Sequence, residues 1–145
     1  MATVMDLLKN KGTDLWFTNP DSTIREALEI MKTHNIGGLP VMKEDKVVGF
    51  FSERDFARHA ITDDCFDMNQ KVEPLMAHPV YFVNPDQKVE ECMAVMTNKK
   101  LRHLPVLENG QMIGIITIGD VVKHLLQDKQ ETIDLLEHFL WVNMI

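Results

Sequence analysis

The stretch Leu39-Pro40-Val41 recurs later in this chain as Leu104-Pro105-Val106, 65 residues further on. Working outward from it, neighbouring motifs recur at the same shift and without a gap. The matching pairs are Asn19-Pro20-Asp21 with Asn84-Pro85-Asp86, Gly49 with Gly114, Asp55 with Asp120, and His59 with His124. A constant shift over so many positions indicates two copies of one structural unit.

Each copy predicts the order strand, helix, strand, strand, helix. A short apolar run, at 15–17 and at 80–83, predicts the first strand, and the Asn-Pro-Asp turn follows it. Apolar residues at helical spacing predict the first helix: Ile24, Ala27, Leu28 and Met31 in one copy, and Val89, Cys92, Met93 and Met96 in the other. Thr23 with Glu26 matches a capping box at the first helix start. We expect the next strand to end in Leu-Pro-Val, another to follow at 47–51 and 112–116, and closing helices to begin near Glu53 and Ile118.

We therefore expect an α/β (α+β) chain of two βαββα repeats. No Gly/Ser-rich linker separates the copies, so they should pack on each other through their sheets. The expected boundaries are 1–62 for the first repeat with its N-terminal lead-in, 63–77 for the connection, 78–127 for the second repeat, and 128–145 for a helical extension. In that extension Ile133, Leu136 and Leu140 share one face, and Phe139 and Trp141 add apolar surface. The extension either packs on its own domain or forms a dimer contact.

The composition of the chain excludes several classes of partner. Its 145 residues carry a formal net charge of −7, which argues against a general affinity for nucleic acid or for an anionic membrane surface. No segment approaches the ~20 consecutive apolar residues of a membrane span. Cys65 lies in an acidic stretch and Cys92 in an apolar helical pattern, which indicates a reducing compartment. We expect a cytoplasmic protein that binds neither nucleic acid nor membrane.

Two matching motifs occur where a strand is expected to run into a helix, Ser52-Glu53-Arg54-Asp55 and Thr117-Ile118-Gly119-Asp120. One interpretation is structural, because a hydroxyl at the N-cap and an acid three residues later satisfy free helix N–H groups. The other is functional. A helix start attracts phosphate, and a carboxylate can accept two hydrogen bonds from a ribose diol. The residues alone leave both interpretations open.

The two copies differ just before Leu-Pro-Val, where Gly37-Gly38 stands in the first and Arg102-His103 in the second. Two glycines allow a flat ring to approach the backbone closely. Arg102 and His103 offer cationic groups for phosphate, the arginine through its fork geometry. A solvent-exposed turn with surface cations explains the same residues without any ligand.

The duplicated pattern of a Leu-Pro-Val strand, an apolar strand and a closing Ser/Thr-x-x-Asp resembles a pair of CBS domains, a Bateman module, of the stand-alone bacterial type. The resemblance extends from about Lys11 to Gln127. It implies two units stacked through their sheets, with two clefts related by a pseudo-twofold axis. It also implies that the clefts bind AMP, ADP, ATP, an NAD-type dinucleotide or S-adenosylmethionine.

The resemblance assigns residues to both clefts. It implies that Asp120 and Asp55 bind the ribose and that the hydroxyls of Thr117 and Ser52 lie on the phosphate side. The first cleft is expected to contain Lys11, Thr13, Trp16, Ile36, Gly37, Gly38, Pro40, Arg102, His103, Thr117 and Asp120. The second is expected to contain Ser52, Arg54, Asp55, Val80 and Leu101. Because the copies differ at Gly37-Gly38, we do not expect equal occupancy of the two clefts.

No catalytic motif of the types G-x-S-x-G, H-E-x-x-H, C-x-x-C or G-x-G-x-x-G is present. We therefore expect no enzyme activity, no metal site and no required cofactor. The leading interpretation is a homodimeric sensor of an adenine nucleotide, with AMP ahead of ATP, ADP and NADH, that regulates an unidentified protein. Three alternatives stay open: a sensor of NAD(H) or S-adenosylmethionine, a nucleotide-processing enzyme, and an interaction module with degenerate clefts.

Overall fold

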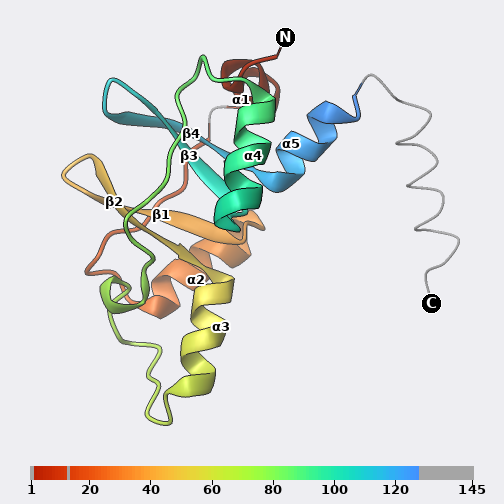
Figure 1. Ribbon diagram of the computed structural model, residues 1–145. Coiled ribbons are helices and arrows are strands. Elements are labelled where there is room, and N and C mark those ends of the chain that lie inside the picture. The colour runs from red at the N-terminus through yellow and green to blue at the C-terminus, as the bar shows by residue number, and fades with distance from the viewer. Residues whose placement is uncertain (1, 13, 128–145) are drawn as a thin grey trace, which may run out of the picture.

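Two antiparallel hairpins, one from each half of the chain, lie next to each other at the centre of the structure (Figure 1). The computed structural model describes residues 2–12 and 14–127. The expected extension at 128–145, with Phe139, Leu140 and Trp141, lies outside the described residues. The hairpins are built from strands β1 (Gly38–Lys43), β2 (Lys46–Ser52), β3 (His103–Glu108) and β4 (Gln111–Thr117). The expectation of two mixed helix-and-strand repeats is confirmed.

The two hairpins have the same strand register at matching positions of the repeat. Leu39 lies opposite Phe51 in the first hairpin, and Leu104 lies opposite Ile116 in the second. Both ladders are irregular at the same place, directly after the valine of Leu-Pro-Val. This motif begins β1 and β3 instead of ending them, because pairing continues to Lys43 and Glu108 in the two hairpins.

Five α-helices and one short 3₁₀ turn surround the hairpins in the described part of the chain. They are α1 (Val4–Lys11), α2 (Ile24–His34), α3 (Glu53–Thr62), η1 (Glu73–Leu75), α4 (Val89–Lys99) and α5 (Ile118–Leu125). The predicted starts of α2, α3 and α5 are confirmed, and the apolar spacing predicted for the helix of the second copy lies within α4. The Thr23 hydroxyl caps α2 by accepting a hydrogen bond from the backbone N–H of Glu26 at 3.1 Å.

The strand expected at the start of each copy is reduced to one bridging residue. Thr18 and Val83 each form a single parallel bridge, to Val41 and Val106, and the apolar runs before them contain no strand. Pro20 and Pro85 follow two residues later in the two copies. A proline has no N–H to continue a ladder, so the pairing stops.

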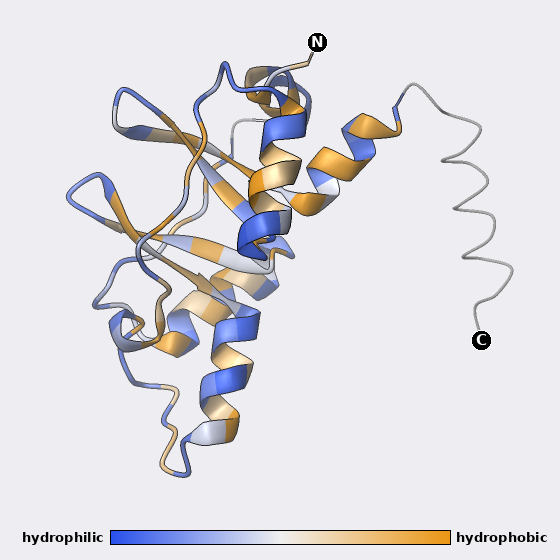
Figure 2. Cartoon of the chain, in the orientation of Figure 1, coloured by the Kyte–Doolittle hydropathy of each residue, from blue (hydrophilic) through white to orange (hydrophobic). Residues whose placement is uncertain are grey.

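The core consists of two clusters of buried apolar side chains, one per hairpin. In the first, Ile24 and Met31 of α2 pack with Leu39, Val41 and Phe51. In the second, residues of α4 and the second hairpin are joined by three side chains of α1, namely Val4, Leu7 and Leu8. Figure 2 shows hydrophobic colouring along both hairpins and hydrophilic colouring at their turns.

Helix α1 therefore belongs spatially to the second repeat, although it precedes the first in sequence. The backbone N–H groups of Val4 and Met5 donate to the carbonyls of Gln87 and Pro85, both at 2.8 Å. This position brings the end of α1, at Lys11, over strand β4. None of the described helices is long and apolar enough to cross a membrane.

Candidate ligand-binding cleft

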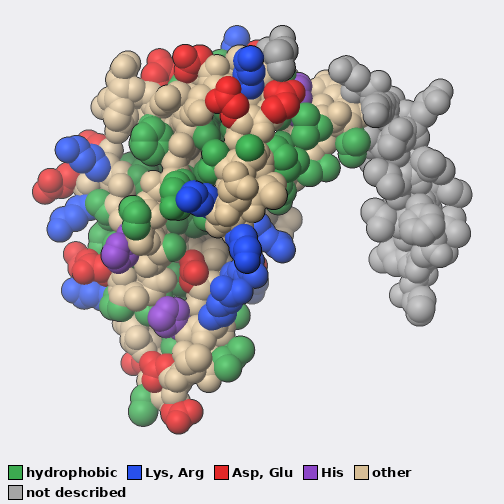
Figure 3. All heavy atoms as spheres, in the orientation of Figure 1, with side chains coloured by type: hydrophobic (Ala, Val, Ile, Leu, Met, Phe, Trp, Pro, Cys, Tyr) green, Lys and Arg blue, Asp and Glu red, His purple; other side chains and the backbone are tan. Residues whose placement is uncertain are grey.

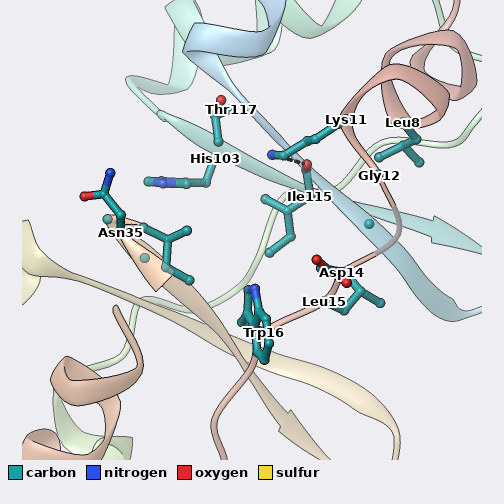
Figure 4. Close-up of a pocket in the computed structure, with 14 residues that line it drawn as sticks. Leu8, Lys11, Gly12, Asp14, Leu15, Trp16, Asn35, His103, Ile115 and Thr117 are labelled. Carbon is teal, nitrogen blue, oxygen red and sulfur yellow. Dashed lines mark hydrogen bonds between the residues drawn. The ribbon is translucent and has the colours of Figure 1, made fainter. Parts of the chain in front are cut away.

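A cavity of about 310 Å³ lies between the two halves, where the end of α1, the segment after it, residues 35–38 and strands β3 and β4 meet (Figure 4). Most of the residues expected in the first cleft line it: Lys11, Trp16, Ile36, Gly37, Gly38, His103 and Thr117. The cavity is thus assembled from three stretches that are far apart in the sequence. Its volume falls within the range of small-molecule pockets.

Four other residues expected in this cleft have different positions. Asp120 lies at the edge of the cavity, bonded to Lys11 and Thr117, which both line it. Pro40 is buried in β1, where its carbonyl accepts a hydrogen bond from the Thr18 N–H. Arg102 is exposed and is not among the lining residues. Thr13 lies outside the described residues.

Several lining residues had not been expected: Leu8, Gly12, Asp14, Leu15, Asn35, Gly114 and Ile115. Gly114 carried a signal, because it repeats Gly49 at the common shift. A Cβ atom at Gly114 would lie 2.5 Å from Cδ2 of Leu8, so the glycine lets α1 approach β4. Asn35 ends α2 in the left-handed conformation with φ of 53°, which asparagine tolerates.

The capping interpretation of Thr117 and Asp120 is confirmed, and the same geometry fixes the Asp120 carboxylate. The Thr117 hydroxyl accepts from the Asp120 N–H at 3.1 Å, and the Thr117 N–H donates to Oδ2 of Asp120 at 2.9 Å. Among the described residues, the hydrogen bonds to this carboxylate all go to Oδ2. Oδ1 is therefore left to accept from a ligand, and capping does not exclude a binding role.

Lys11 forms the principal ion pair of the cleft. Its Nζ lies 2.8 Å from Oδ2 of Asp120 and donates to the Ile115 carbonyl at 2.9 Å, as Figure 4 shows for the latter. Partial burial raises the pKa of Asp120, but the bonds from Lys11 and Thr117 outweigh it and hold that pKa below its usual range. Asp120 is consequently a carboxylate at neutral pH.

His103 connects the two halves through its imidazole ring. The ring centroid lies 5.0 Å from that of Phe50 in the other hairpin. A Cβ atom at Gly38 would lie 2.5 Å from Phe50 Cε1 and 3.4 Å from His103 Cε1. In this structure the space left by the missing side chain of Gly38 is therefore occupied by the rings of Phe50 and His103. Burial lowers the pKa of His103, and the charges of Lys11 and Arg102 lower it further.

Ser52 and Asp55, which the resemblance assigns to a second cleft, repeat the capping geometry of Thr117 and Asp120. The Ser52 hydroxyl accepts from the Asp55 N–H at 3.1 Å and donates to Asp55 Oδ2 at 2.9 Å. Val80 and Leu101 are half-buried, and Arg54 is exposed.

The edge of β2 is closed where the matching edge of β4 is open. Phe50 exchanges two backbone hydrogen bonds with Ala77, at 3.0 and 2.7 Å, and Met76 packs over Gly49. At the matching point of the first cleft, the Ile115 carbonyl accepts only from the movable side chain of Lys11 in the described structure. The two hairpin edges are therefore not equivalent.

An aromatic ring accompanies a basic side chain at corresponding places in the two halves. Trp16 stacks on His34, with ring centroids 3.4 Å apart and an interplanar angle of 12°. At the positions one repeat later in the numbering, Nζ of Lys99 lies 5.2 Å from the ring centroid of Tyr81. Trp16 is 38% exposed and lines the cavity, so its indole is available to a ligand ring.

The sequence pattern of the CBS domain matches residues 3–61 and 72–127. The chain therefore belongs to the CBS domain family, with two repeats. It is 32% identical over 149 residues to the CBS domain-containing protein CBSX3, mitochondrial, of Arabidopsis thaliana, covering 96% of this chain and 72% of that protein. A solved structure of the CBS domain NE2398 superimposes with a TM-score of 0.82 at 38% identity, covering 86% of this chain and 98% of the other.

Two further solved structures contain small molecules. CBSX2 in complex with AMP has a TM-score of 0.74 and 27% identity, with coverage of 89% and 99%. The CBS domain pair of MJ0100, in complex with 5-methylthioadenosine and S-adenosyl-L-methionine, has a TM-score of 0.76 and 25% identity, with coverage of 89% and 98%. Among the described residues, no group of three or more His, Cys, Asp or Glu side chains could hold a metal ion.

The lowered pKa of His103 predicts a pH-dependent stability. The unfolded chain binds a proton at this residue near pH 6.5, while the folded chain resists it. The contribution is therefore fully present above about pH 6.5 and is lost as the pH falls through the folded-state pKa. Nuclear magnetic resonance should give a His103 titration midpoint below 6.5, and His103→Gln should flatten the decline of unfolding free energy below that pH. A midpoint at or above 6.5 would contradict the burial argument.

Proposed function

We propose that the chain is a non-catalytic regulatory module that binds an adenine nucleotide, AMP, in the first cleft. The observation that carries this proposal is the cavity itself, in which a lysine, a stacked tryptophan and a helix N-cap lie beside a fixed carboxylate. The three parts of a nucleotide need a cation, an apolar platform and an acceptor for the ribose diol. The cleft contains all three within one small volume.

The chemistry of each part of AMP matches one region of the cleft. The ribose hydroxyls are donors, and Oδ1 of Asp120 is a charged acceptor. The phosphate is an anion, and Lys11 with the start of α5 at Thr117 is the positive end of the cleft. The adenine is a flat apolar ring that suits the space between Trp16 and Ile36.

The complexes of similar proteins support an adenine-containing ligand and leave its identity to experiment. CBSX2 binds AMP, and MJ0100 binds S-adenosyl-L-methionine. The sulfonium of the latter is cationic, whereas Lys11 is the one lysine or arginine among the residues that line this cavity. Asp14 also lines the cavity and offers a carboxylate to a sulfonium, so binding measurements and not the lining charges separate AMP from S-adenosylmethionine. The output, regulation of a partner protein in the cytoplasm, is proposed from the family resemblance.

Thermal unfolding tests the proposed ligand. A ligand that binds only the native state stabilises it by RT ln(1+[L]/Kd), about 2.7 kcal/mol at a hundredfold excess over Kd. AMP should therefore raise the melting midpoint of ligand-stripped protein by about 5 °C. NADH and S-adenosylmethionine serve as rival ligands, and chromatography of the incubated nucleotide reveals any turnover. An unchanged midpoint at millimolar AMP would refute the proposal.

Substitution of the two aspartates ranks the clefts. Asp120→Ala should weaken AMP binding at least about tenfold, because a charge-assisted ribose contact of roughly 1.5–3 kcal/mol is lost. Asp55→Ala should have a smaller effect, because Ala77 closes the edge of β2 beside it. Calorimetric titration of both variants measures the difference. Loss of binding in Asp55→Ala with normal binding in Asp120→Ala would reverse the ranking and leave the family assignment intact.

We also propose a homodimer, on the basis of apolar side chains left exposed on the helices. Val122 and Leu125 on α5 are 40% and 39% exposed, and Ile61 on α3 is 82% exposed. Figure 3 shows hydrophobic side chains gathered over α5. Twofold closure is the commonest way to cover such a surface.

Light scattering at micromolar concentration should give twice the mass of the chain. Truncation after Gln127 tests the extension separately, and the mass of a single chain would refute the dimer.

A further inference from the structure

A ribose diol can donate to both oxygens of a carboxylate, and Lys11 occupies one of the two, Oδ2 of Asp120, so that, among the residues described, only Oδ1 is left free. The Lys11 ammonium has three N–H donors, and two of them are bonded to the cleft itself, at 2.8 Å to Asp120 and 2.9 Å to the Ile115 carbonyl. The contact joins the end of α1 to strand β4 and to the first turn of α5. In this arrangement the ammonium of Lys11 blocks Oδ2 of Asp120 and the carbonyl of Ile115 from a ligand.

The geometry around Lys11 allows its ammonium to leave Asp120 for another anionic partner. The Lys11 and Asp120 side chains are 37% and 27% exposed, and an ion pair so accessible to water is weak. Lys11 is the last residue of α1, and Gly12 follows it with φ of 105°. A Cβ atom at Gly12 would have no atom within 4 Å. Lys11 is therefore attached at a helix end, where the backbone of the next residue has open space beside it.

Within the described part of the chain, no second lysine or arginine lines the cavity beside Lys11. Among the lining residues it is the one lysine or arginine, since Arg102 is exposed outside the cavity. His103 does line the cavity, but its lowered pKa keeps the imidazole uncharged at neutral pH. The phosphate-binding charge that the sequence pattern assigned to Arg102 and His103 thus falls on a residue of α1.

We propose that Lys11 selects phosphate-bearing adenine ligands over the uncharged nucleoside, by passing from Asp120 to the phosphate when the ligand binds. This rests on the proposed function. A nucleotide that takes Asp120 for its ribose offers the displaced ammonium a new anionic partner. Adenosine takes the same acceptor and offers none. The selectivity therefore comes from the exchange and not from the phosphate contact alone.

Calorimetric titration of AMP and adenosine, on the full chain stripped of ligand, tests this role. The wild type should prefer AMP by about tenfold or more, a ratio typical of one charge-assisted contact. In Lys11→Met the AMP affinity should fall and the adenosine affinity should rise, so the preference should shrink at least about fivefold. Lys11→Arg should keep the preference. Lys9→Met is the matched control, because Lys9 is an exposed lysine of α1 that does not line the cavity.

The same Lys11 substitution in an Asp120 variant separates the exchange of partners from a general effect of Lys11 on the structure. With Asp120→Asn already present, Lys11→Met should no longer raise the adenosine affinity, because the ion pair it breaks is gone. Equal loss of AMP and adenosine binding in Lys11→Met, or an unchanged preference, would overturn the role of Lys11 and leave the proposed function standing. A wild-type chain that binds neither compound would overturn the proposed function and this role with it.

Discussion

Gly38 is the position on which the meeting of the two halves depends. Any side chain there would collide with Phe50, because a Cβ atom would lie 2.5 Å from that ring and 3.4 Å from the imidazole of His103. With a hydrogen atom in that place, a residue of β3 packs against the ring of a residue of β2 across the interface between the repeats. The cavity opens beside this contact. A close backbone approach at one glycine thus sets where a ligand can lie.

The helix caps link local stability to the site. Thr117 and Ser52 each begin a helix and each hold an aspartate by the same pair of contacts. A carboxylate held in this way needs little reorganisation to receive a ligand, since its position is already determined by the backbone of its own helix. The capping and binding interpretations of the Ser/Thr-x-x-Asp motif are therefore compatible.

The asymmetry between the clefts arises from what reaches each hairpin edge. At β2 the chain arrives as backbone, and Ala77 closes the edge with two hydrogen bonds. At β4 it arrives as the end of α1, and Lys11 reaches the Ile115 carbonyl with a side chain. A backbone bridge is fixed by the fold, whereas a side-chain contact can be exchanged for a contact to a ligand. We therefore propose that the ligand binds beside β4, where the contact can be exchanged, and not beside β2.

The sequence alone was enough to predict the duplication, the order of helices α2 to α5 and of the hairpin strands, and the capping motifs, because each of these depends on residues close together in the chain. It also indicated half of the cleft lining, from Lys11 and Trp16 to Thr117, once the repeat and its family resemblance were recognised. It did not indicate that α1 packs on the second repeat, or that Lys11 bonds to Asp120 while Arg102 is not among the residues that line the cavity. Those features join residues about a hundred positions apart, and only the packing of the two halves brings such residues together. The single-bridge first strands were missed for a related reason: the length of a ladder depends on its partner strand as well as on its own apolar run.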